Sequence, residues 1–380
     1  MRIAVVHSFY SSSVPSGENE IVLKQVEILR RHGHEVLLIG RSTDEMQASH
    51  FYPLASGIRV ITGRGSFPLA DLNSFEPDVI HVHNLFPNFG TSWLTKTKVP
   101  IVVTVHNYRN ICANGLFFRD GKPCFECLEG SKIAAVIHAC YRDSSVASVP
   151  LAIRNSRGLD ANPLFTIAKK IQFLNSQAAS IHVANGLDSK KVVVIPNGLA
   201  NSIPRTSDTV KREWVYVGRL TREKGIQELL QVWPREMHLN VVGSGELEKQ
   251  LRADSKENIH FLGSLPNETV KDLIATAQGV LIPSQCLEMQ PTVAIEALQF
   301  GVPVVAHRNN AAATLITEYE CGATYVGLED ISIAIDLVNS ERNHLSKNAR
   351  HTFERLFSET TWLENQLAEY RKAHHRGITQ

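Results

Sequence analysis

One stretch of the sequence, residues 279–306 (GVLIPSQCLEMQPTVAIEALQFGVPVVA), constrains the fold more than any other. It begins with an apolar run of the length of a buried parallel strand, Gly279–Pro283, and continues through a polar loop. Pro291 suits the first position of a helix over Thr292–Phe300, which a glycine ends. Val302–Ala306 then predicts a second strand. Such a strand–loop–helix–strand unit belongs to an open α/β sheet, which binds ligands at the carboxyl ends of its strands.

Two carboxylates stand in this unit, Glu288 in the loop and Glu296 in the helix, with seven residues between them. The first helical turn presents backbone N–H groups at Thr292 and Val293 and the positive end of the helix dipole, which suit a diphosphate. A carboxylate for sugar hydroxyls and another for a ribose would complete a site for a nucleotide sugar. The alternative is a solvated helix glutamate and an unrelated loop charge, and the pair alone leaves both interpretations open.

The bulk properties of the chain narrow the function classes. Its 380 residues, 43% of them hydrophobic, leave room for two domains. The 39 Lys and Arg nearly balance the 38 Asp and Glu, so no basic field indicates a nucleic-acid partner. No run of 18 apolar residues indicates a membrane-spanning helix, and the N-terminal residues lack the pattern of a signal peptide. A cytoplasmic location is therefore the expectation.

The first half begins as a Rossmann-like unit. Arg2–His7 predicts a strand, Asn19–Arg31 a helix and His34–Gly40 a second strand. The intervening loop lacks G-x-G-x-x-G, so a dinucleotide is not indicated. Gly17, near the helix start, would let a sugar or phosphate approach the backbone, although a plain turn glycine is equally compatible with the sequence.

Two further predicted strands, Asp78–His83 and Ile101–His106, each end in a histidine that an asparagine follows. A histidine at the carboxyl end of a parallel strand points toward the ligand crevice of this architecture. A structural histidine is the alternative for each of them. We favour His106 as the functional one, because it leads into the polar, aromatic loop Asn107–Arg109.

An insertion over residues 107–140 carries four cysteines: Cys112, Cys124, Cys127 and Cys140. The central C-x2-C spacing is typical of zinc sites, and four thiolates would complete a tetrahedral structural site. The outer spacings differ from those of a standard zinc finger. Reduced thiols are therefore the leading interpretation, structural zinc is the second, and disulfides are the third.

The segment Lys132–Leu174 mixes apolar stretches with six basic and two acidic residues. An apolar and basic face on a nearly neutral chain suits peripheral contact with an anionic membrane. Amphipathic core helices with solvated Lys and Arg side chains are the favoured alternative.

The second half follows a polar linker, Leu199–Lys211, and restarts with a predicted strand, Glu213–Gly218. Arg219 and Lys224 flank the strand-to-helix turn that comes next. Two cations in this position could clamp a diphosphate, although exposed charges at a helix start are common. Gly243 opens a glycine-rich turn after the following strand.

Together these motifs resemble the retaining family 4 glycosyltransferases of GT-B fold, within glycosyltransferase group 1. The resemblance rests mainly on Glu288-x7-Glu296 and on the run VGRL-x3-KG, which contains Arg219 and Lys224. Weaker matches are Gly17–Glu18, the strand that ends at His106, and Pro196–Asn197–Gly198. The resemblance spans nearly the whole chain.

The resemblance implies an α/β fold with two Rossmann-like domains that face each other across a cleft. Residues 1–200 would form the acceptor-binding domain, with the cysteine-rich insertion 107–140. Residues 201–358 would bind the nucleotide sugar, and residues 359–380 would form a helix that crosses back to the first domain.

The resemblance also implies a hexosyltransferase that retains the anomeric configuration, uses a UDP- or GDP-sugar and requires no metal for catalysis. Arg219 and Lys224 would neutralise the diphosphate leaving group, and Glu296 would hold the ribose. Glu288 would hold the donor sugar, which His106 would contact from the first domain. The remaining donor-binding residues would be Gly17, Gly243, Met289, Gln290, Pro291 and Thr292.

The acceptors usual in the family that the chain resembles, together with the basic apolar segment, favour a glycan or lipid-linked acceptor in cell-surface polysaccharide biosynthesis. Two alternatives remain at this point. One keeps the fold but changes the chemistry to that of a nucleotide-sugar epimerase or a phosphorylase. The other is a nucleotide-sugar-binding protein without enzymatic activity.

Overall fold

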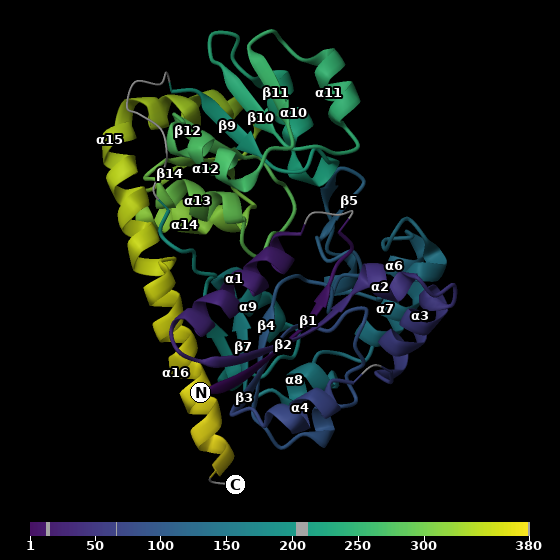
Figure 1. Cartoon of the computed structure of the whole chain (residues 1–380). Coiled ribbons are helices and arrows are strands. Elements are labelled where there is room, and N and C mark those ends of the chain that lie inside the picture. The colour runs from purple at the N-terminus through teal and green to yellow at the C-terminus, as the bar shows by residue number, and fades with distance from the viewer. Residues whose placement is uncertain (13–15, 66, 203–211, 379–380) are drawn as a thin grey trace. The chain divides into compact units, whose positions relative to one another are not determined.

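The computed structural model describes residues 1–378 except 13–15, 66 and 203–211, so most of the predicted linker Leu199–Lys211 lies outside the described residues. The chain divides into two compact units, which are labelled element by element in Figure 1. The first unit comprises Met1–Phe117, Cys124–Asn197 and Trp362–Gln380. The second comprises Gly198–Thr361 and the short segment Phe118–Pro123.

The first unit is built on a six-stranded sheet whose paired strands are all parallel. Its strands are, in spatial order, β2 (Glu35–Ser42), β1 (Arg2–Phe9), β3 (Val79–Asn84), β4 (Ile101–Val105), β7 (Lys170–Phe173) and β8 (Val192–Val194). The central strands β3 and β4 are buried almost throughout, as in a sheet covered on both faces, and β3 carries the histidines His81 and His83 among its apolar residues. β7 lies inside the segment for which helices are predicted.

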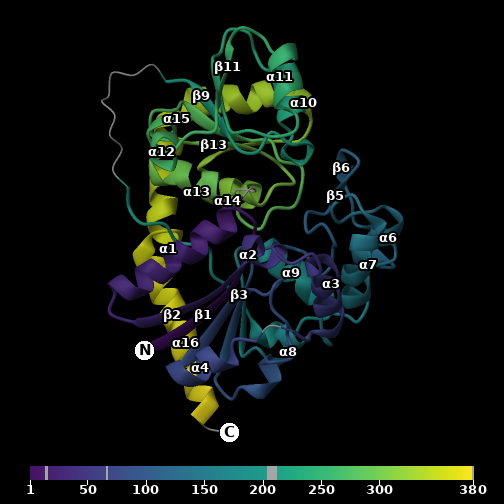
Figure 2. The same cartoon turned by 45° about the vertical axis from the view of Figure 1, so that its right-hand side comes forward.

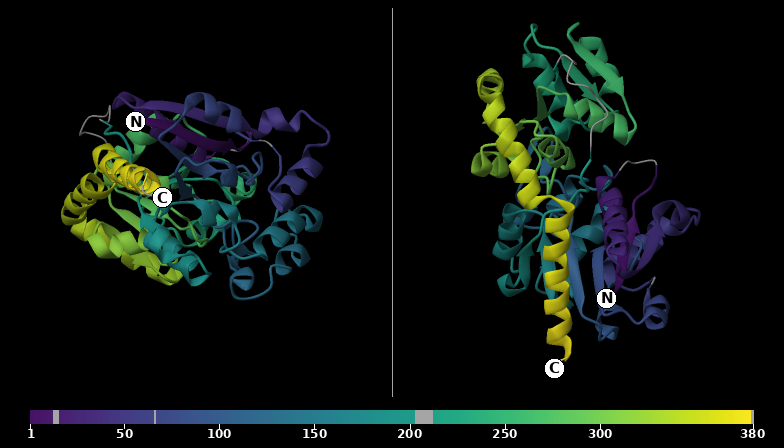
Figure 3. Two further views of the ribbon diagram at one scale, coloured as in Figure 1. Left: turned by 90° about the horizontal axis from the view of Figure 1, so that it is seen from below. Right: turned by 60° about the vertical axis from the view of Figure 1, so that its left-hand side comes forward.

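Helices α1 (Gly17–Arg31) and α16 (Glu359–Ile378) pack with β1 around one core. Val5, Val26, Trp362 and Tyr370 are buried members of that core. The final helix, α16, therefore completes the first unit although it comes from the other end of the chain, and Figure 3 shows it running alongside the N-terminal strands. Its Tyr370 hydroxyl lies 2.7 Å from Nδ1 of His81.

The other helical segments of the first unit are short, and Figure 2 shows α3, α6 and α7 gathered beside one another. They are α2 (Thr43–Gln47), α3 (Tyr52–Thr62), α4 (Leu69–Phe75), η1 (Leu94–Lys96), α5 (Glu126–Glu129), α6 (Ala134–Ile137), α7 (Ser145–Asn155), α8 (Pro163–Ile167), α9 (Ser176–Ala184) and η2 (Ser189–Lys191). A two-stranded hairpin, β5 (Phe118–Arg119) with β6 (Lys122–Pro123), interrupts the cysteine-rich insertion.

The second unit repeats the architecture with its own six-stranded parallel sheet. Its strands are, in spatial order, β11 (Ile259–Gly263), β10 (Leu239–Val242), β9 (Trp214–Val217), β12 (Gly279–Ile282), β13 (Val304–His307) and β14 (Gly322–Tyr325). Its helical segments are η3 (Arg222–Lys224), α10 (Ile226–Val232), α11 (Glu248–Asp254), α12 (Asn267–Ala275), α13 (Thr292–Gln299), α14 (Ala311–Tyr319), η4 (Leu328–Asp330) and α15 (Ile331–Leu356).

Residues 279–306 fold as the sequence predicts, into β12, a loop, α13 and β13. Pro291 occupies the N-cap of α13 rather than its first helical position. Gly301 follows the helix with φ +65°, the left-handed conformation that favours glycine at a helix end. In the described part of the chain, no helix has both the length and the apolar character needed to cross a membrane.

Candidate active site

The site in the second unit is centred on a buried ion pair between Lys224 and Glu288. Lys224 lies in η3, just after β9, and Glu288 lies in the loop after β12. Because β9 and β12 are neighbours in a parallel sheet, their carboxyl ends meet at one edge. Lys224 Nζ lies 2.5 Å from Glu288 Oε1, and the hydroxyl of Ser284 donates to the same oxygen at 2.8 Å.

The two charges hold each other in the ionised state. Burial is the largest single influence and would lower the pKa of Lys224, but the charge and hydrogen bond of Glu288, together with Cys286, outweigh it, so the pKa lies above its usual value. Burial would likewise raise the pKa of Glu288, but the charge and hydrogen bond of Lys224, with the Ser284 hydroxyl and the charge of Arg219, together outweigh it, and the pKa is lowered. The site therefore holds a fixed cation and a fixed anion at neutral pH.

Arg219 joins this charge cluster from the turn after β9. Its Nη2 lies 2.7 Å from Oε1 of Glu223, and the hydroxyl of Thr221 donates to the same oxygen at 2.7 Å. The charge of Arg219 also contributes to the lowered pKa of Glu288. The structure thus brings three of the predicted site residues, Arg219, Lys224 and Glu288, into one electrostatic environment.

Two glycines let the loops of this site pack directly on one another. A Cβ on Gly243, which has φ +128°, would lie 2.0 Å from the carbonyl oxygen of Gly218. A Cβ on Gly225, which has φ +66°, would lie 2.2 Å from the carbonyl oxygen of Pro283. Neither position has room for a side chain, so the backbone on both sides of the Arg219–Lys224 turn is closely fixed.

The remaining predicted residues of this unit lead from Glu288 into α13. Met289 is buried, whereas Gln290, Pro291, Thr292 and Glu296 are half-buried. Pro291 at the N-cap gives α13 no side-chain cap. The first-turn amides and the positive dipole end therefore lie next to Glu288 in the sequence without an acceptor side chain at the cap position.

The predicted residues His106 and Gly17 belong to the first unit. His106 Nε2 lies 2.9 Å from Nδ1 of His83, and the two rings are stacked. Burial lowers the pKa of His106 to about 3, and that of His83 falls well below its usual value. Both imidazoles are thus neutral, and one donates to the other. Gly17 is the exposed first residue of α1.

Glu18 enters the sequence analysis only as part of the Gly17–Glu18 match, and its polar contacts were not predicted. Glu18 Oε2 lies 3.4 Å from Asn107 Nδ2 and 3.5 Å from the hydroxyl of Tyr10, which accepts from Arg109 at 2.9 Å. Burial raises the pKa of Glu18 to about 7, against the opposing charge of Arg109. A glutamate beside Gly17 was visible in the sequence, but nothing there placed it against residues nearly ninety positions later.

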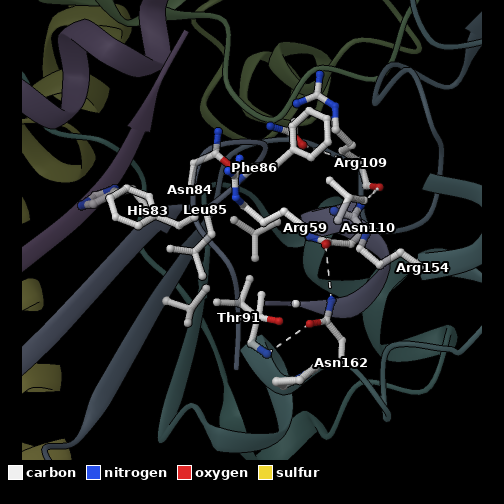
Figure 4. A pocket seen from close by; sticks show the side chains of 18 of the residues that line it. Arg59, His83, Asn84, Leu85, Phe86, Thr91, Arg109, Asn110, Arg154 and Asn162 are labelled. Carbon is white, nitrogen blue, oxygen red and sulfur yellow. Dashed lines mark hydrogen bonds between the residues drawn. The ribbon is translucent and has the colours of Figure 1, made fainter. Parts of the chain in front are cut away.

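A cavity of about 200 Å³ also lies in the first unit, and Figure 4 shows several of the side chains that line it. Its lining includes four arginines, Arg59, Arg109, Arg154 and Arg157, together with His83 and His106. Burial and the charge of Arg109 lower the pKa of Arg154 to about 9. No sequence signal predicted this site, because the arginines come from separate segments of the chain.

The zinc hypothesis gains no support from the structure. Within the residues described, no three Cys, His, Asp or Glu side chains are placed to hold a metal ion. No disulfide joins the four described cysteines of the insertion. Cys112 Sγ donates to Asn114 at 3.0 Å, and Cys127 packs in a small apolar core with Leu151. Burial raises the pKa of both thiols, which disfavours thiolate ligands.

Comparisons with known proteins agree with this arrangement. The model of the glycosyl transferase 4-like domain matches residues 16–198, and that of the glycosyl transferases group 1 matches residues 202–352. The putative teichuronic acid biosynthesis glycosyltransferase TuaC of Bacillus subtilis is 25% identical, with 84% of each chain covered. A GDP-mannose-dependent alpha-mannosyltransferase of Corynebacterium glutamicum is 24% identical, over 84% of this chain and 75% of that protein.

Solved structures show the same fold. A sucrose-phosphate synthase from Thermosynechococcus elongatus superposes with a TM-score of 0.69 at 16% identity, with 98% of each chain covered. Anabaena Alr3699/HepE, in complex with UDP and glucose, gives a TM-score of 0.64 at 16% identity, over 98% of this chain and 100% of that one. With its two parallel-sheet units, its C-terminal helix and two matching family models that span most of its length, the chain belongs to the group 1, family 4 glycosyltransferases of GT-B fold.

Proposed function

We propose that this glycosyltransferase moves a hexose from a UDP- or GDP-sugar to an acceptor with retention of the anomeric configuration. The observation that carries the proposal is the placement of Lys224, Arg219 and Glu288 together at the carboxyl edge of the second sheet. A diphosphate is the ligand that two cations and a helix N-terminus suit. The relatives support this choice of donors, since one is GDP-mannose-dependent and one solved structure holds UDP and glucose.

Each proposed role follows from the chemistry of the side chain. Lys224 and Arg219 stabilise the negative charge that develops on the leaving diphosphate, which removes the need for a divalent metal. Glu288 accepts hydrogen bonds from the donor-sugar hydroxyls, and Glu296 from those of the ribose. Gly243 and the residues Met289–Thr292 contribute backbone and side-chain contacts to the donor. Gly17 and His106 are the proposed contributions of the first unit.

The proposed acceptor is a glycan or a lipid-linked glycan of a cell surface. The name of the Bacillus subtilis relative, which refers to teichuronic acid biosynthesis, supports this class. Peripheral contact with an anionic membrane belongs to the same proposal. It is supported by exposed apolar side chains on, or at the N-caps of, the helices α3, α6 and α7, which pack beside one another (Figure 2). These are Phe51, Leu54, Ile58, Ile133, Ile137 and Val146, each more than half exposed.

The donor site is tested by nucleotide-sugar binding and turnover. Isothermal titration calorimetry with UDP-glucose and GDP-mannose should show saturable binding of at least one of them. Glu288→Gln should abolish turnover of that donor, and proton NMR of the wild-type product should show the donor's anomeric configuration. A Glu288→Gln variant that turns over the donor at the wild-type rate would refute the role of this pair.

The membrane contact is tested separately by flotation of the protein with vesicles of phosphatidylcholine and phosphatidylglycerol. The wild-type chain should float with the anionic vesicles, and a Leu54→Ser/Ile137→Ser variant should float less. Leu23→Ser is the matched control, because Leu23 is also half-exposed but lies on α1. Equal flotation of all three chains, or of none, would end this part of the proposal.

A further inference from the structure

The cavity of the first unit is organised around guanidinium groups. Arg59 comes from α3, Arg109 from the loop after β4, and Arg154 and Arg157 from α7 and its C-terminal end. Arg59 is only 8% exposed. Among the described residues that line the cavity there is no Asp or Glu. The charged side chains that line the cavity are therefore all basic, and its described lining includes no carboxylate counter-charge.

Backbone carbonyls fix three of these arginines in position. Arg59 Nη1 donates to the carbonyl of Pro87 at 3.0 Å, and Arg154 Nη2 donates to that of Arg109 at 2.6 Å. Arg157 Nη1 donates to the carbonyl of Ile61 at 2.5 Å. A guanidinium has five N–H donors, so a single bond of this kind orients the group and leaves other donors for a ligand.

Aromatic stacking adds to the same preorganisation. The guanidinium carbons of Arg109 and Arg154 lie 4.9 Å and 5.8 Å from the centre of the Phe86 ring, and Figure 4 shows the three side chains together. Such cation–π contacts hold the two planar cations near each other without neutralising them. Two like charges held this close favour an anion between or beside them.

The cationic charge of the cavity lacks a direct ionic partner. Within the described part of the chain, none of the four arginines lies within 4.0 Å of a carboxylate oxygen. The Nε atoms of Arg59 and Arg109 are buried and have no hydrogen-bond partner there. A shielded charge without an ionic partner, such as that of the buried Arg59, is unfavourable, and a ligand that brings negative charge and acceptor oxygens would relieve it.

The size and the remaining lining narrow the ligand further. Pockets that hold a drug-sized ligand span roughly 300–1,000 Å³, so a cavity of about 200 Å³ suits one compact group. Asn110 and Asn162 add amide groups that could meet sugar hydroxyls. Four guanidiniums match the several oxygens and the double charge of a phosphate better than a single carboxylate.

We propose that this arginine cavity binds a phosphate group on the acceptor of the transferase. The inference rests on the proposed function, which supplies the acceptor, and it assigns to that acceptor a chemical class. The phosphate could belong to a soluble sugar phosphate or to the head group of a lipid-linked acceptor. Both sources present the same tetrahedral anion to Arg59, Arg154 and Arg157.

The test measures binding of inorganic phosphate to the full chain by isothermal titration calorimetry. The wild type should bind saturably, and Arg154→Gln/Arg157→Gln should bind at least about ten-fold more weakly, because charge-assisted bonds are lost. If the double variant does not fold, Arg157→Gln replaces it in the binding measurement, because Arg157 is exposed and its substitution should not disturb the core. Arg30→Gln is the matched control, since Arg30 is exposed on α1 and also donates to a backbone carbonyl.

Two competition arms separate the sources of the phosphate. Displacement by glucose 6-phosphate indicates a soluble acceptor, and displacement by phosphatidylcholine vesicles that contain phosphatidic acid indicates a lipid head group. Phosphate binding that neither probe displaces overturns the assignment to the acceptor. The absence of saturable phosphate binding to the wild type, or equal binding by wild type and arginine variants, overturns the site itself.

Nucleotide binding on the same samples separates this inference from the proposed function. The arginine variants should bind UDP or GDP as the wild type does, because the residues proposed to hold the diphosphate and the ribose, Arg219, Lys224 and Glu296, lie in the second unit. A wild-type chain that binds phosphate but neither nucleotide would refute the proposed donor site and leave the anion site intact. A wild-type chain that binds nucleotide but not phosphate would refute the anion site and leave the proposed donor site intact.

Discussion

The ammonium of Lys224 and the carboxylate of Glu288 lie 2.5 Å apart, although they are 64 positions apart in the sequence. Both side chains are largely shielded, with 24% and 13% of their surfaces exposed. Each compensates the burial cost of the other, so removal of one leaves the other as an unpaired charge. The pair thus ties the turn after β9 to the loop after β12.

Replacement of Glu288 by Gln should therefore destabilise the chain as well as impair donor turnover. We expect a loss of about 1–3 kcal/mol in the free energy of unfolding, because Lys224 stays buried without its partner. Glu223→Gln is the matched control, since its partner Arg219 is more exposed, and should cost about 0.2–1 kcal/mol. Urea unfolding measures both, and equal losses would contradict this account of the pair.

Replacement of Gly243 by Ala should disturb the donor site through the backbone. The new Cβ would lie 2.0 Å from the Gly218 carbonyl oxygen, so the turn before Arg219 must move. We expect a loss of several-fold in nucleotide affinity and a lower thermal midpoint. Gly33→Ala is the matched control. Gly33 also has a positive φ, so the variant has the backbone strain, but no atom of the described residues lies within 4 Å of the new Cβ, so it has no steric clash. Its cost should be about 1–2 kcal/mol, without an effect on nucleotide affinity.

Glu18 should make stability depend on pH. Its pKa rises from 4.5 to about 7 in the folded chain, so the folded state retains a proton that the unfolded state releases. The contribution of Glu18 to stability is therefore present below pH 4.5, and is lost as the pH rises through about 7. Relative to the wild type, Glu18→Gln should gain up to about 3 kcal/mol between these two values. Unfolding curves measured across that range test this, and a constant difference would contradict it.

Removal of divalent metal should leave glycosyl transfer unchanged. In the proposed mechanism Arg219, Lys224 and the amino end of α13 stabilise the diphosphate without a metal ion. Transfer rates should therefore be equal with EDTA and with added magnesium or manganese. A rate that collapses in EDTA and recovers with metal would show that the two cations do not suffice.

Much of the fold followed from local sequence signals. Residues 279–306 fold as predicted, because each signal there depends on a few neighbouring residues. These signals are the apolar run that ends at Pro283, the proline before the helix and the glycine that follows it at position 301. β7 and β14 escaped prediction because they are four residues long and mix polar with apolar side chains, as KIQF and GATY. Only their pairing with neighbouring strands makes them strands.

The candidate site residues likewise include some that the sequence predicted and some that it did not. Arg219, Lys224 and Glu288 stand in recognisable runs, and the structure places them together. The arginine cavity was not predictable, since Arg59, Arg109 and Arg154 are about fifty residues apart and meet only through tertiary packing. Arg154 also shows why a local count of charges misleads. It belongs to the basic segment Lys132–Leu174, yet it turns inward, toward the carbonyl of Arg109.

The placement of α16 in the first unit has a consequence for any attempt to express that unit by itself. A gene fragment that stops at Asn197 would lack Trp362 and Tyr370, both of which are buried against β1 and α1, and would strip His81 of its phenolic partner. Such a fragment would present a bare apolar groove to solvent and should precipitate. A fusion that joins α16 to the end of the fragment through a glycine–serine tether should restore a soluble, folded product.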